Sequence, residues 1–219
     1  MPDIAGEKQL SLVEHALTSM RERILSGEYP PGSRLRLHVL AQETGASLIP
    51  VREALRVLET ERLIETIPNR GARVVPLSIT DMNDLYAVRI LLEAEAVRAA
   101  VPIDGKTEKE LLRILSKMKV AVKENETKEI IRLNQEFHFG IYRRSNSQWL
   151  LYLIDLLWNH TERYQRLSLS FRHDAADREH RAILKALAAG QSEEAAIAMR
   201  DHLRTTATLV AEYFKKTEA

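Results

Sequence analysis

The amino-acid sequence predicts a mainly helical protein in two parts, in which three helices and a β-hairpin precede a bundle of antiparallel helices. Apolar side chains recur three or four residues apart along most of the 219 residues, as on the buried face of an α-helix. Residues 63–75 instead have the short apolar runs of a hairpin. Leu, Ala, Arg and Glu recur throughout while aromatic residues make up only 5%, and this balance favours helices over sheets.

The composition limits the class of protein. Apolar residues make up 45% and charged residues 29%, which are ordinary values for a globular chain. The absence of cysteine excludes disulfides and thiolate metal ligands. We find no charged and then apolar leader and no long apolar run, so we expect a cytoplasmic protein that does not interact with a membrane.

Residues 1–76 are expected to form the first part. An amphipathic helix is predicted over residues 10–25, where the apolar positions are Val13, Leu17, Met20 and Ile24. The sequence Tyr-Pro-Pro-Gly at residues 29–32 predicts a turn, because proline lacks an N–H donor and glycine accommodates positive φ. A short second helix is expected to contain residues 39–41 and to end near Gly45.

A third helix is expected to begin near Ser47, whose hydroxyl is a plausible N-cap, with Pro50 tolerated in the first turn. The apolar stripe of this helix consists of Val51, Ala54, Leu55 and Leu58. Residues 63–67 and 72–75 are predicted strands, joined by a Pro-Asn-Arg-Gly turn. Three helices followed by such a hairpin indicate a winged helix-turn-helix.

The second part, residues 77–219, is expected to be all-helical, with residues 76–80 as the linker. Breaks rich in Pro, Gly, Ser and Asn separate its predicted helices. Those helices are 80–100, 107–124, 128–144, 148–170, 174–189 and 192–216.

Net charge does not indicate a nucleic-acid partner. It is only +1, and residues 1–76 contain ten basic and ten acidic side chains. Any DNA contact must come from local arrangement, because the second helix of a helix-turn-helix enters the major groove. Arg52 could bind a guanine or a phosphate, Arg56 would touch the backbone, and Arg70 at the wing tip could reach the minor groove. Arginines that merely keep the surface soluble are the alternative.

Residues 10–75 closely resemble the N-terminal domain of the GntR family of regulators. The matching segments are Pro31-Gly32-Ser33-Arg34-Leu35, Leu40-Ala41, Gly45, Pro50-Val51-Arg52-Glu53-Ala54-Leu55 and Asn69-Arg70-Gly71. The resemblance implies a homodimer that binds an inverted repeat in double-stranded DNA. It places the positions of Arg34, Ser47, Leu48, Arg52 and Gly71 at the DNA.

Three residues depart from the family pattern. Leu48 stands where the family usually has Arg, and Ile49 where it often has Thr, so contact with a thymine methyl could replace polar contacts there. Base preference therefore stays open. Arg62 replaces the usual Gly after the recognition helix, a change that can alter the turn into the wing.

In the second part, polar side chains occupy positions where helical periodicity predicts apolar ones. Asn134 and His138 lie four residues apart on one apolar face, and His180 and His202 lie on the apolar faces of their own helices. The apolar residues that define these faces are Ile130, Phe137, Ile141, Ile183, Leu184, Leu187, Met199, Leu209 and Val210.

His180 lies ten residues before Gly190 and His202 twelve after it, so a helix pair that turns at Gly190 brings both to nearly the same level. With Asn134 and His138 they could offer three imidazole nitrogens and an amide oxygen to one divalent cation. Zinc is the expected ion, with nickel or manganese as alternatives. Hydrogen-bonded structural histidines are the competing interpretation, and we keep it for those without such convergence: His15, His38, His160 and His173.

Arg89 interrupts a further apolar stripe, which consists of Leu85, Leu92, Ala96 and Ala99. A buried guanidinium needs an anion. Asp or Glu from a neighbouring helix could supply it, and a ligand carboxylate is the alternative. A neutral-ligand cation site together with Arg89 predicts a positive cavity for a small carboxylate or sugar acid.

The second part also resembles the FCD ligand-binding domain of FadR-type regulators over nearly its full length. The landmarks are Asp84-Leu85, Arg89, Leu92-Glu93, Asn134, Phe137-His138, Glu179-His180-Arg181 and His202-Leu203. The resemblance implies that Asn134, His138, His180 and His202 ligate the cation and that Arg89 faces the effector, with Asn134 as a further effector contact. It also implies the shorter, six-helix variant of the domain, whose members usually dimerise.

The expected function is a ligand-responsive transcription regulator, acting as a repressor of a catabolic operon. A metal-dependent hydrolase is one alternative, but it needs a general base, and Glu136 lies about 200° around the helix from His138. The other alternative is an architectural DNA binder without an effector, which would have no use for buried His and Arg. The sequence therefore favours the regulator.

Overall fold

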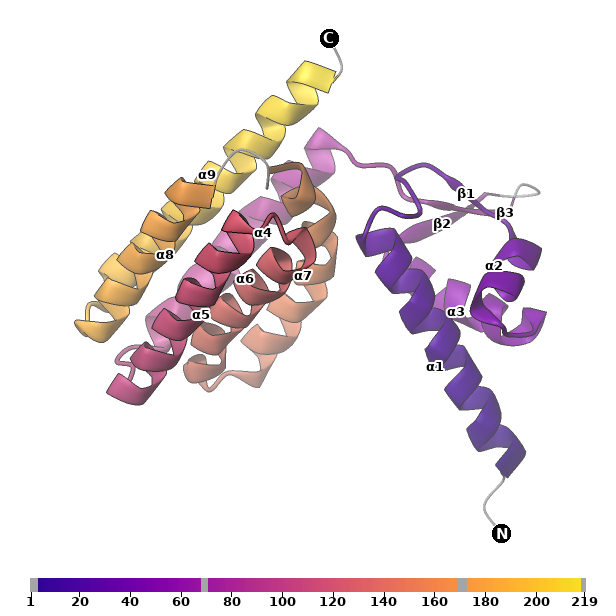
Figure 1. The fold of residues 1–219 in the computed structure, drawn as a ribbon, viewed down its shortest axis with the longest axis horizontal. Coiled ribbons are helices and arrows are strands. Elements are labelled where there is room, and N and C mark those ends of the chain that lie inside the picture. The colour runs from indigo at the N-terminus through magenta and orange to yellow at the C-terminus, as the bar shows by residue number, and fades with distance from the viewer. Residues whose placement is uncertain (1–3, 68–70, 169–172, 218–219) are drawn as a thin grey trace. The chain divides into compact units, whose positions relative to one another are not determined.

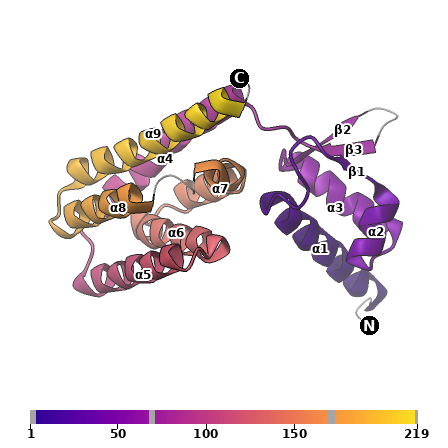
Figure 2. The ribbon, with the colours of Figure 1, turned by 45° about the horizontal axis from the view of Figure 1, so that its top comes forward.

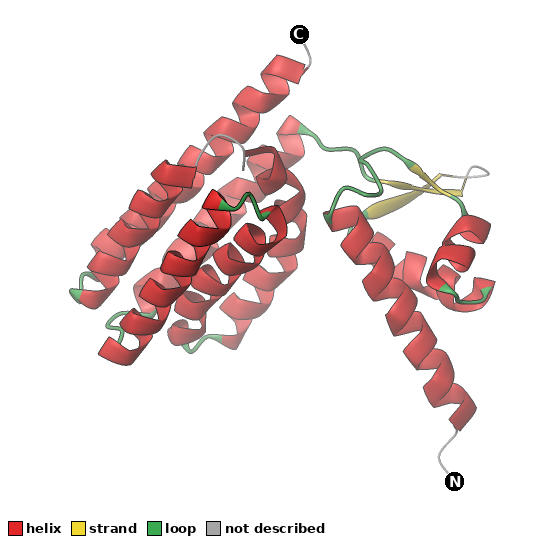
Figure 3. Cartoon of the chain, in the orientation of Figure 1, coloured by secondary structure: helices red, strands yellow, loops and turns green. Residues whose placement is uncertain are grey.

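The computed structural model describes residues 4–67, 71–168 and 173–217, and it confirms the expected mainly helical class with a small sheet (Figures 1 and 3). The chain divides into two compact units, Met1–Ser78 and Ile79–Ala219. Each unit has its own hydrophobic core. None of the helices in the described ranges is both long and apolar enough to cross a membrane.

The first unit contains three helices and a three-stranded sheet: α1 (Ile4–Leu25), β1 (Arg34–Leu35), α2 (Leu37–Thr44), α3 (Leu48–Thr60), β2 (Ile64–Ile67) and β3 (Gly71–Val74). The strands are antiparallel in the order β1-β3-β2. The sequence did not predict β1, because two residues are too few to show alternation. It pairs Arg34 with Arg73 and Leu35 with Ala72, so the wing is wider than a hairpin.

The core of this unit explains the orientation of α3. Val51, Ala54 and Leu58 are fully buried, while Leu55 is half-buried at the edge of the stripe. They pack with apolar side chains of α1, α2 and the sheet, including Met20, Ile24, Leu35, Leu40, Ile64 and Val74. Because this stripe is anchored inside, the opposite side of α3 faces solvent and exposes Arg52 and Arg56.

The second unit is all-helical over the described residues from Ile79 onward. Its helices are α4 (Ile79–Ala99), α5 (Gly105–Lys123), α6 (Thr127–Tyr142), α7 (Gln148–Ser168), α8 (His173–Ala188) and α9 (Ser192–Thr217), with a 3₁₀ turn at Arg143–Ser145. The predicted bounds differ from these by at most two residues, and residues 169–172 lie outside the described ranges. The bundle has α4 packed on α9, α5 beside α6, and α8 beside α9 (Figure 2).

Two glycines shape the bundle. Gly190 has φ of +72° in the turn between α8 and α9, a conformation that favours glycine. Gly140 lies where α6 meets α5, and a Cβ built on it would lie 2.9 Å from Leu111 Cδ2. The hairpin of α8 and α9 and the close contact of α5 with α6 therefore both depend on residues without a side chain.

Candidate functional site

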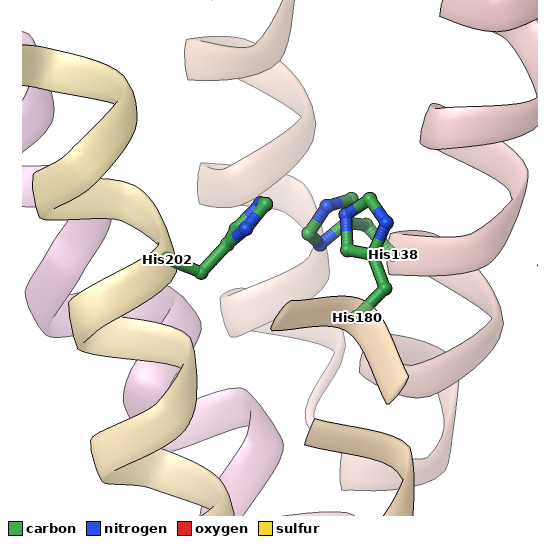
Figure 4. A group of neighbouring side chains, drawn as sticks. All are labelled: His138, His180 and His202. Atoms are coloured by element: carbon green, nitrogen blue, oxygen red, sulfur yellow. The ribbon is translucent and has the colours of Figure 1, made fainter. Parts of the chain in front are cut away.

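Three buried histidines from separate helices meet in the second unit. His138 lies on α6, His180 on α8 and His202 on α9, and their rings turn toward one another (Figure 4). The ring centroids are 4.6 to 5.2 Å apart, and one candidate ligand atom from each residue lies within 4.8 Å of the others. The exposed fractions of His138, His180 and His202 are only 1%, 1% and 6%, so all three histidines lie inside the core of the bundle.

The hairpin at Gly190 brings His180 and His202 together, as the residue count predicts, with ring centroids 4.6 Å apart. His138 joins them from α6, whose buried face also carries Phe137 and Ile141. Trp158 of α7 lies against His138 at 5.5 Å between ring centroids. The cluster is therefore held by the apolar packing of four helices.

The donor set fits a divalent transition metal. Three imidazoles are ligands suited to zinc, nickel or copper, and a tetrahedral zinc site with bonds of about 2.0 to 2.1 Å separates its nitrogens by about 3.4 Å. The candidate ligand atoms lie within 4.8 Å of one another, so they would approach by at most about 1.4 Å on binding one ion. Asn134 lies one helical turn before His138 and is half-buried, and its part in the site stays a prediction.

Arg89 is buried on α4 with 1% of its side chain exposed, and its Nε donates to Glu93 Oε1 at 2.6 Å. Of the two alternatives, an acidic side chain is therefore present, but it comes from α4 itself and not from a neighbouring helix, because the residue four positions along faces the guanidinium. Burial disfavours the charge, but the attraction of Glu93, together with smaller contributions from Tyr86 and Tyr142, raises the pKa of Arg89 overall. Ala99, which was expected on the same apolar stripe as Arg89, is exposed.

The other two nitrogens of Arg89, Nη1 and Nη2, are buried and have no hydrogen-bond partner among the described residues. The guanidinium carbon lies 4.9 Å from the ring centroid of Tyr86 and 5.2 Å from that of Trp158. Aromatic faces stabilise the charge without using its N–H donors. Nη1 and Nη2 can therefore donate together to one anion in a bidentate arrangement.

A hydrogen-bonded chain joins Arg89 to the histidines. The Tyr142 hydroxyl donates to Glu93 Oε2 in a short contact and lies 3.0 Å from His138 Nδ1. On the other side of the cluster, Glu179 Oε2 lies 2.7 Å from His202 Nδ1. No role for Tyr142, Glu93 or Glu179 was predicted from the sequence. For two of them the spacing indicates a partner, since Tyr142 follows His138 by four residues and Glu93 follows Arg89 by four, which places each pair on one helix face.

Glu136 does not take part in the cluster. Its carboxylate accepts from Arg132 Nη1 at 2.8 Å on the same helix, and Arg132 is exposed. This position agrees with the predicted angle around α6 and leaves Glu136 unsuited to serve as a general base for water at the histidines.

In the first unit, the tip of α3 presents a mixed apolar and basic surface. Ser47 occupies the N-cap position with extended backbone, but its side chain makes no capping hydrogen bond. Ile49 is 60% exposed and Leu48 is half-buried, while Arg52 projects into solvent one turn later. The Ser47 hydroxyl and these side chains are therefore available to a groove. Arg56 differs, since its Nη1 pairs with Glu53 at 2.9 Å.

The remaining predicted DNA contacts lie on the sheet. Arg34 is exposed on β1, and Gly71 begins β3 with φ of +82°. Arg70 lies outside the described residues. Arg62 has φ of +55°, a left-handed conformation that glycine adopts without the strain that a side chain causes.

Comparison with known proteins supports both units. The family model described as bacterial regulatory proteins, gntR family, matches residues 12–74, and the FCD domain model matches residues 84–205. The HTH-type transcriptional regulator BphR of Paraburkholderia xenovorans is 30% identical over 213 residues, which is 93% of this chain and 86% of that protein. The gluconate operon transcriptional repressor of Bacillus subtilis is 34% identical over 141 residues, 64% of this chain and 56% of the repressor.

The fold agrees with a solved structure as well. The Escherichia coli protein McbR/YncC superposes with a TM-score of 0.80 at 24% identity, covering 93% of this chain and 98% of that one. The matched families and relatives are transcription regulators and not enzymes. This chain accordingly belongs to the GntR family of bacterial transcription regulators, with a DNA-binding helix-turn-helix followed by an FCD domain.

Proposed function

We propose that this regulator represses a catabolic operon and responds to a small organic or sugar acid that binds beside a divalent cation. The observation that carries the proposal is the joining of the histidine cluster to Arg89 through Tyr142 and Glu93. A buried guanidinium with two unpaired nitrogens and a set of three neutral imidazoles is otherwise a costly arrangement in a hydrophobic core.

Charge supports an anionic effector. Three imidazoles and an amide would leave the double charge of the cation uncompensated, while Arg89 and Glu93 neutralise each other. A bound cation would supply a Lewis acid for one oxygen of the effector. Arg89 would hold a carboxylate through Nη1 and Nη2, with Asn134 as a further contact. The relative from Bacillus subtilis is named for the gluconate operon, which favours sugar acids and repression.

Zinc is the proposed ion, with nickel or manganese as alternatives. Three imidazoles accept any of these ions, and geometry and availability rather than affinity decide which of them occupies such a site. At a free concentration of one hundred times the dissociation constant, the ion would stabilise the fold by about 2.7 kcal/mol.

The proposed DNA target is an inverted repeat bound by a homodimer in the cytoplasm. Arg34, Ser47, Leu48, Arg52 and Gly71 are the proposed contacts, joined by Arg56 at the backbone and by Arg70 on the wing. A helix-turn-helix dimer reads two half-sites about one helical turn apart.

An exposed apolar stripe on α7 supports the dimer. Trp149, Tyr152, Leu153 and Leu156 are 75%, 59%, 38% and 42% exposed, at the spacing of one helix face. On α4, which packs against α7, Leu91 is 72% exposed. Contiguous apolar surface of this kind marks interfaces, and a second copy would bury it.

The test combines metal analysis with operator binding. Purified protein is expected to contain one equivalent of metal per chain, and removal by a chelator should lower the melting temperature by several degrees. A duplex selected from random sequences is then titrated at fixed salt with a panel of organic and sugar acids. An active acid should change operator affinity by roughly 5- to 150-fold, the usual range of allosteric coupling.

The triple variant His138→Ala, His180→Ala, His202→Ala should lose both the metal and the response to the acid. His15→Ala is the matched control, since this exposed histidine lies on α1 and belongs to the other compact unit of the chain. A triple variant with wild-type metal content and melting temperature would contradict the site. A full response from metal-free wild-type protein would contradict the role of the metal.

A further inference from the structure

We infer that Glu93, acting through the Tyr142 hydroxyl, and Glu179, acting directly, position His138 and His202 so that each offers its Nε2 atom to the cation. The inference rests on the cation site proposed above and concerns residues outside the ligand set. Ligating histidines need a partner for the other ring nitrogen, since that partner selects the tautomer and the ring orientation.

On the His138 side, the direction of each hydrogen bond follows from the donors available. Arg89 Nε donates to Glu93 Oε1 at 2.6 Å, and a carboxylate that faces a guanidinium acts as an acceptor. The single proton of the Tyr142 hydroxyl therefore goes to Glu93 Oε2, and its oxygen is left to accept. His138 Nδ1, 3.0 Å away, must be the donor. The lone pair of the neutral ring is then on Nε2.

Burial makes this arrangement persistent. Tyr142 and Glu93 are both fully buried. The Met199 sulfur, 3.8 Å from the hydroxyl, is a much weaker acceptor than the carboxylate. The proton on Tyr142 thus has one favoured destination, and His138 one favoured tautomer.

On the His202 side, the carboxylate acts without an intermediary. Glu179 Oε2 lies 2.7 Å from His202 Nδ1, and Glu179 precedes His180 on α8. An ionised carboxylate accepts the proton of Nδ1 and leaves the lone pair on Nε2. Two of the three rings are therefore oriented by carboxylates at their Nδ1 atoms, one in direct contact and one through a phenol.

The tautomers of His138 and His202 provide a measurement that would not change if Tyr142 and Glu179 had only a structural role. In metal-free, full-length protein labelled with ¹⁵N-histidine, long-range ¹H–¹⁵N spectra should show His138 and His202 as the Nδ1–H tautomer. Signals are assigned with single histidine substitutions. Tyr142→Phe should convert His138 toward a mixture of tautomers, and Glu179→Ala should do the same for His202.

Zinc affinity, measured by competition with a chromophoric chelator, is the second readout. Each of these two variants should bind zinc about 10- to 100-fold more weakly, as expected when the hydrogen-bond partner of a ligand is lost. Glu179→Gln keeps an acceptor and should retain most of the affinity. Tyr164→Phe is the matched control, because it also removes a buried tyrosine hydroxyl, but one that donates to Asp81 Oδ2 at 2.8 Å and not to Glu93.

The outcomes separate the inference from the function on which it rests. Wild-type protein that binds no zinc would overturn the cation site and the inference with it. Zinc binding that both variants leave unchanged, or Nε2–H tautomers in the wild type, would overturn the inference alone. Thermal melts of the metal-free variants show whether a loss of zinc affinity comes from unfolding. Tyr142→Phe is chosen because it removes only the hydroxyl and conserves the shape of the ring.

Discussion

At the scale of single residues, the buried pair of Arg89 and Glu93 carries a cost in stability. A buried ion pair gains little over apolar side chains of similar volume, because desolvation offsets the attraction. Two nitrogens of Arg89 also lack a hydrogen-bond partner among the described residues. This cost is consistent with the proposed role of Arg89 in binding an anion.

Removal of one member of this pair should be far more harmful than removal of both. We expect Arg89→Met to lower the free energy of unfolding by about 3 to 5 kcal/mol, because it leaves the carboxylate of Glu93 buried without a counterion. The double variant Arg89→Met, Glu93→Gln should recover most of that loss. Urea denaturation of the metal-free protein measures all three.

The control for this comparison is Arg98→Met, which breaks surface contacts of Arg98 with Glu95 and Glu193. It should leave the stability nearly unchanged, since exposed ion pairs contribute little. Equal losses in the single and double variants of Arg89 would show that the charge of Glu93 is not what destabilises the single variant.

At the scale of elements, α3 shows how a buried stripe determines a reading surface. Val51, Ala54 and Leu58 anchor the helix in the core, so Arg52 necessarily faces outward near its first turns. Arg56 follows one turn later but is engaged with Glu53. The two arginines should therefore contribute differently to DNA binding.

We expect Arg52→Ala to weaken binding to a selected operator by about 1 to 3 kcal/mol, the usual value of one bidentate base contact. Arg56→Ala should weaken specific and unrelated DNA about equally, because a phosphate contact carries no sequence information. Fluorescence anisotropy at fixed salt measures both affinities, and the control is Arg113→Ala, which changes an exposed arginine on α5. Unchanged operator affinity would remove Arg52 from the reading surface.

The contact of α5 with α6 gives a second test at this scale. A Cβ on Gly140 would lie 2.9 Å from Leu111 Cδ2, and Leu111 is itself 1% exposed, so it has little room to move. We expect Gly140→Val to cost about 1 to 3 kcal/mol of stability through overpacking. Combined with Leu111→Ala, the loss should be smaller than the sum of the two single losses. Additive losses in urea denaturation would count against the close contact.

At the scale of the whole molecule, the proposed regulation requires two copies of the chain. The effector can change operator affinity only by favouring one arrangement of the two DNA-binding units in the dimer. The stripe of Trp149, Tyr152, Leu153 and Leu156 on α7 is the surface proposed to join the copies.

We expect Leu153→Glu combined with Leu156→Glu to convert the proposed dimer into a monomer of 25.0 kDa, because charges would be buried in an apolar interface. Sedimentation velocity measures the mass, and operator affinity should fall with it. The matched control is Leu112→Glu with Val120→Glu, which places the same charges at exposed apolar positions of α5. A variant of α7 that stays dimeric would place the interface elsewhere.

The sequence by itself determined the fold class and most helix bounds, because helical periodicity and glycine or proline breaks are local properties. It also predicted that His180 and His202 meet, since the rise per residue and a turn at Gly190 suffice for that. The resemblance to known families added the order of the ligand positions. The described helices of the second unit depart from their predicted bounds by two residues at most.

Tertiary structure decided which polar groups on different helices are partners. Tyr142 lies four residues after His138 on α6, as spacing allows, but only the packing of α4 against α6 brings Tyr142 to Glu93. The strand β1 likewise exists only because β3 pairs with it. A residue's face on a helix follows from its neighbours in sequence, whereas its hydrogen-bond partner follows from which helix lies opposite, and that is a property of the whole core.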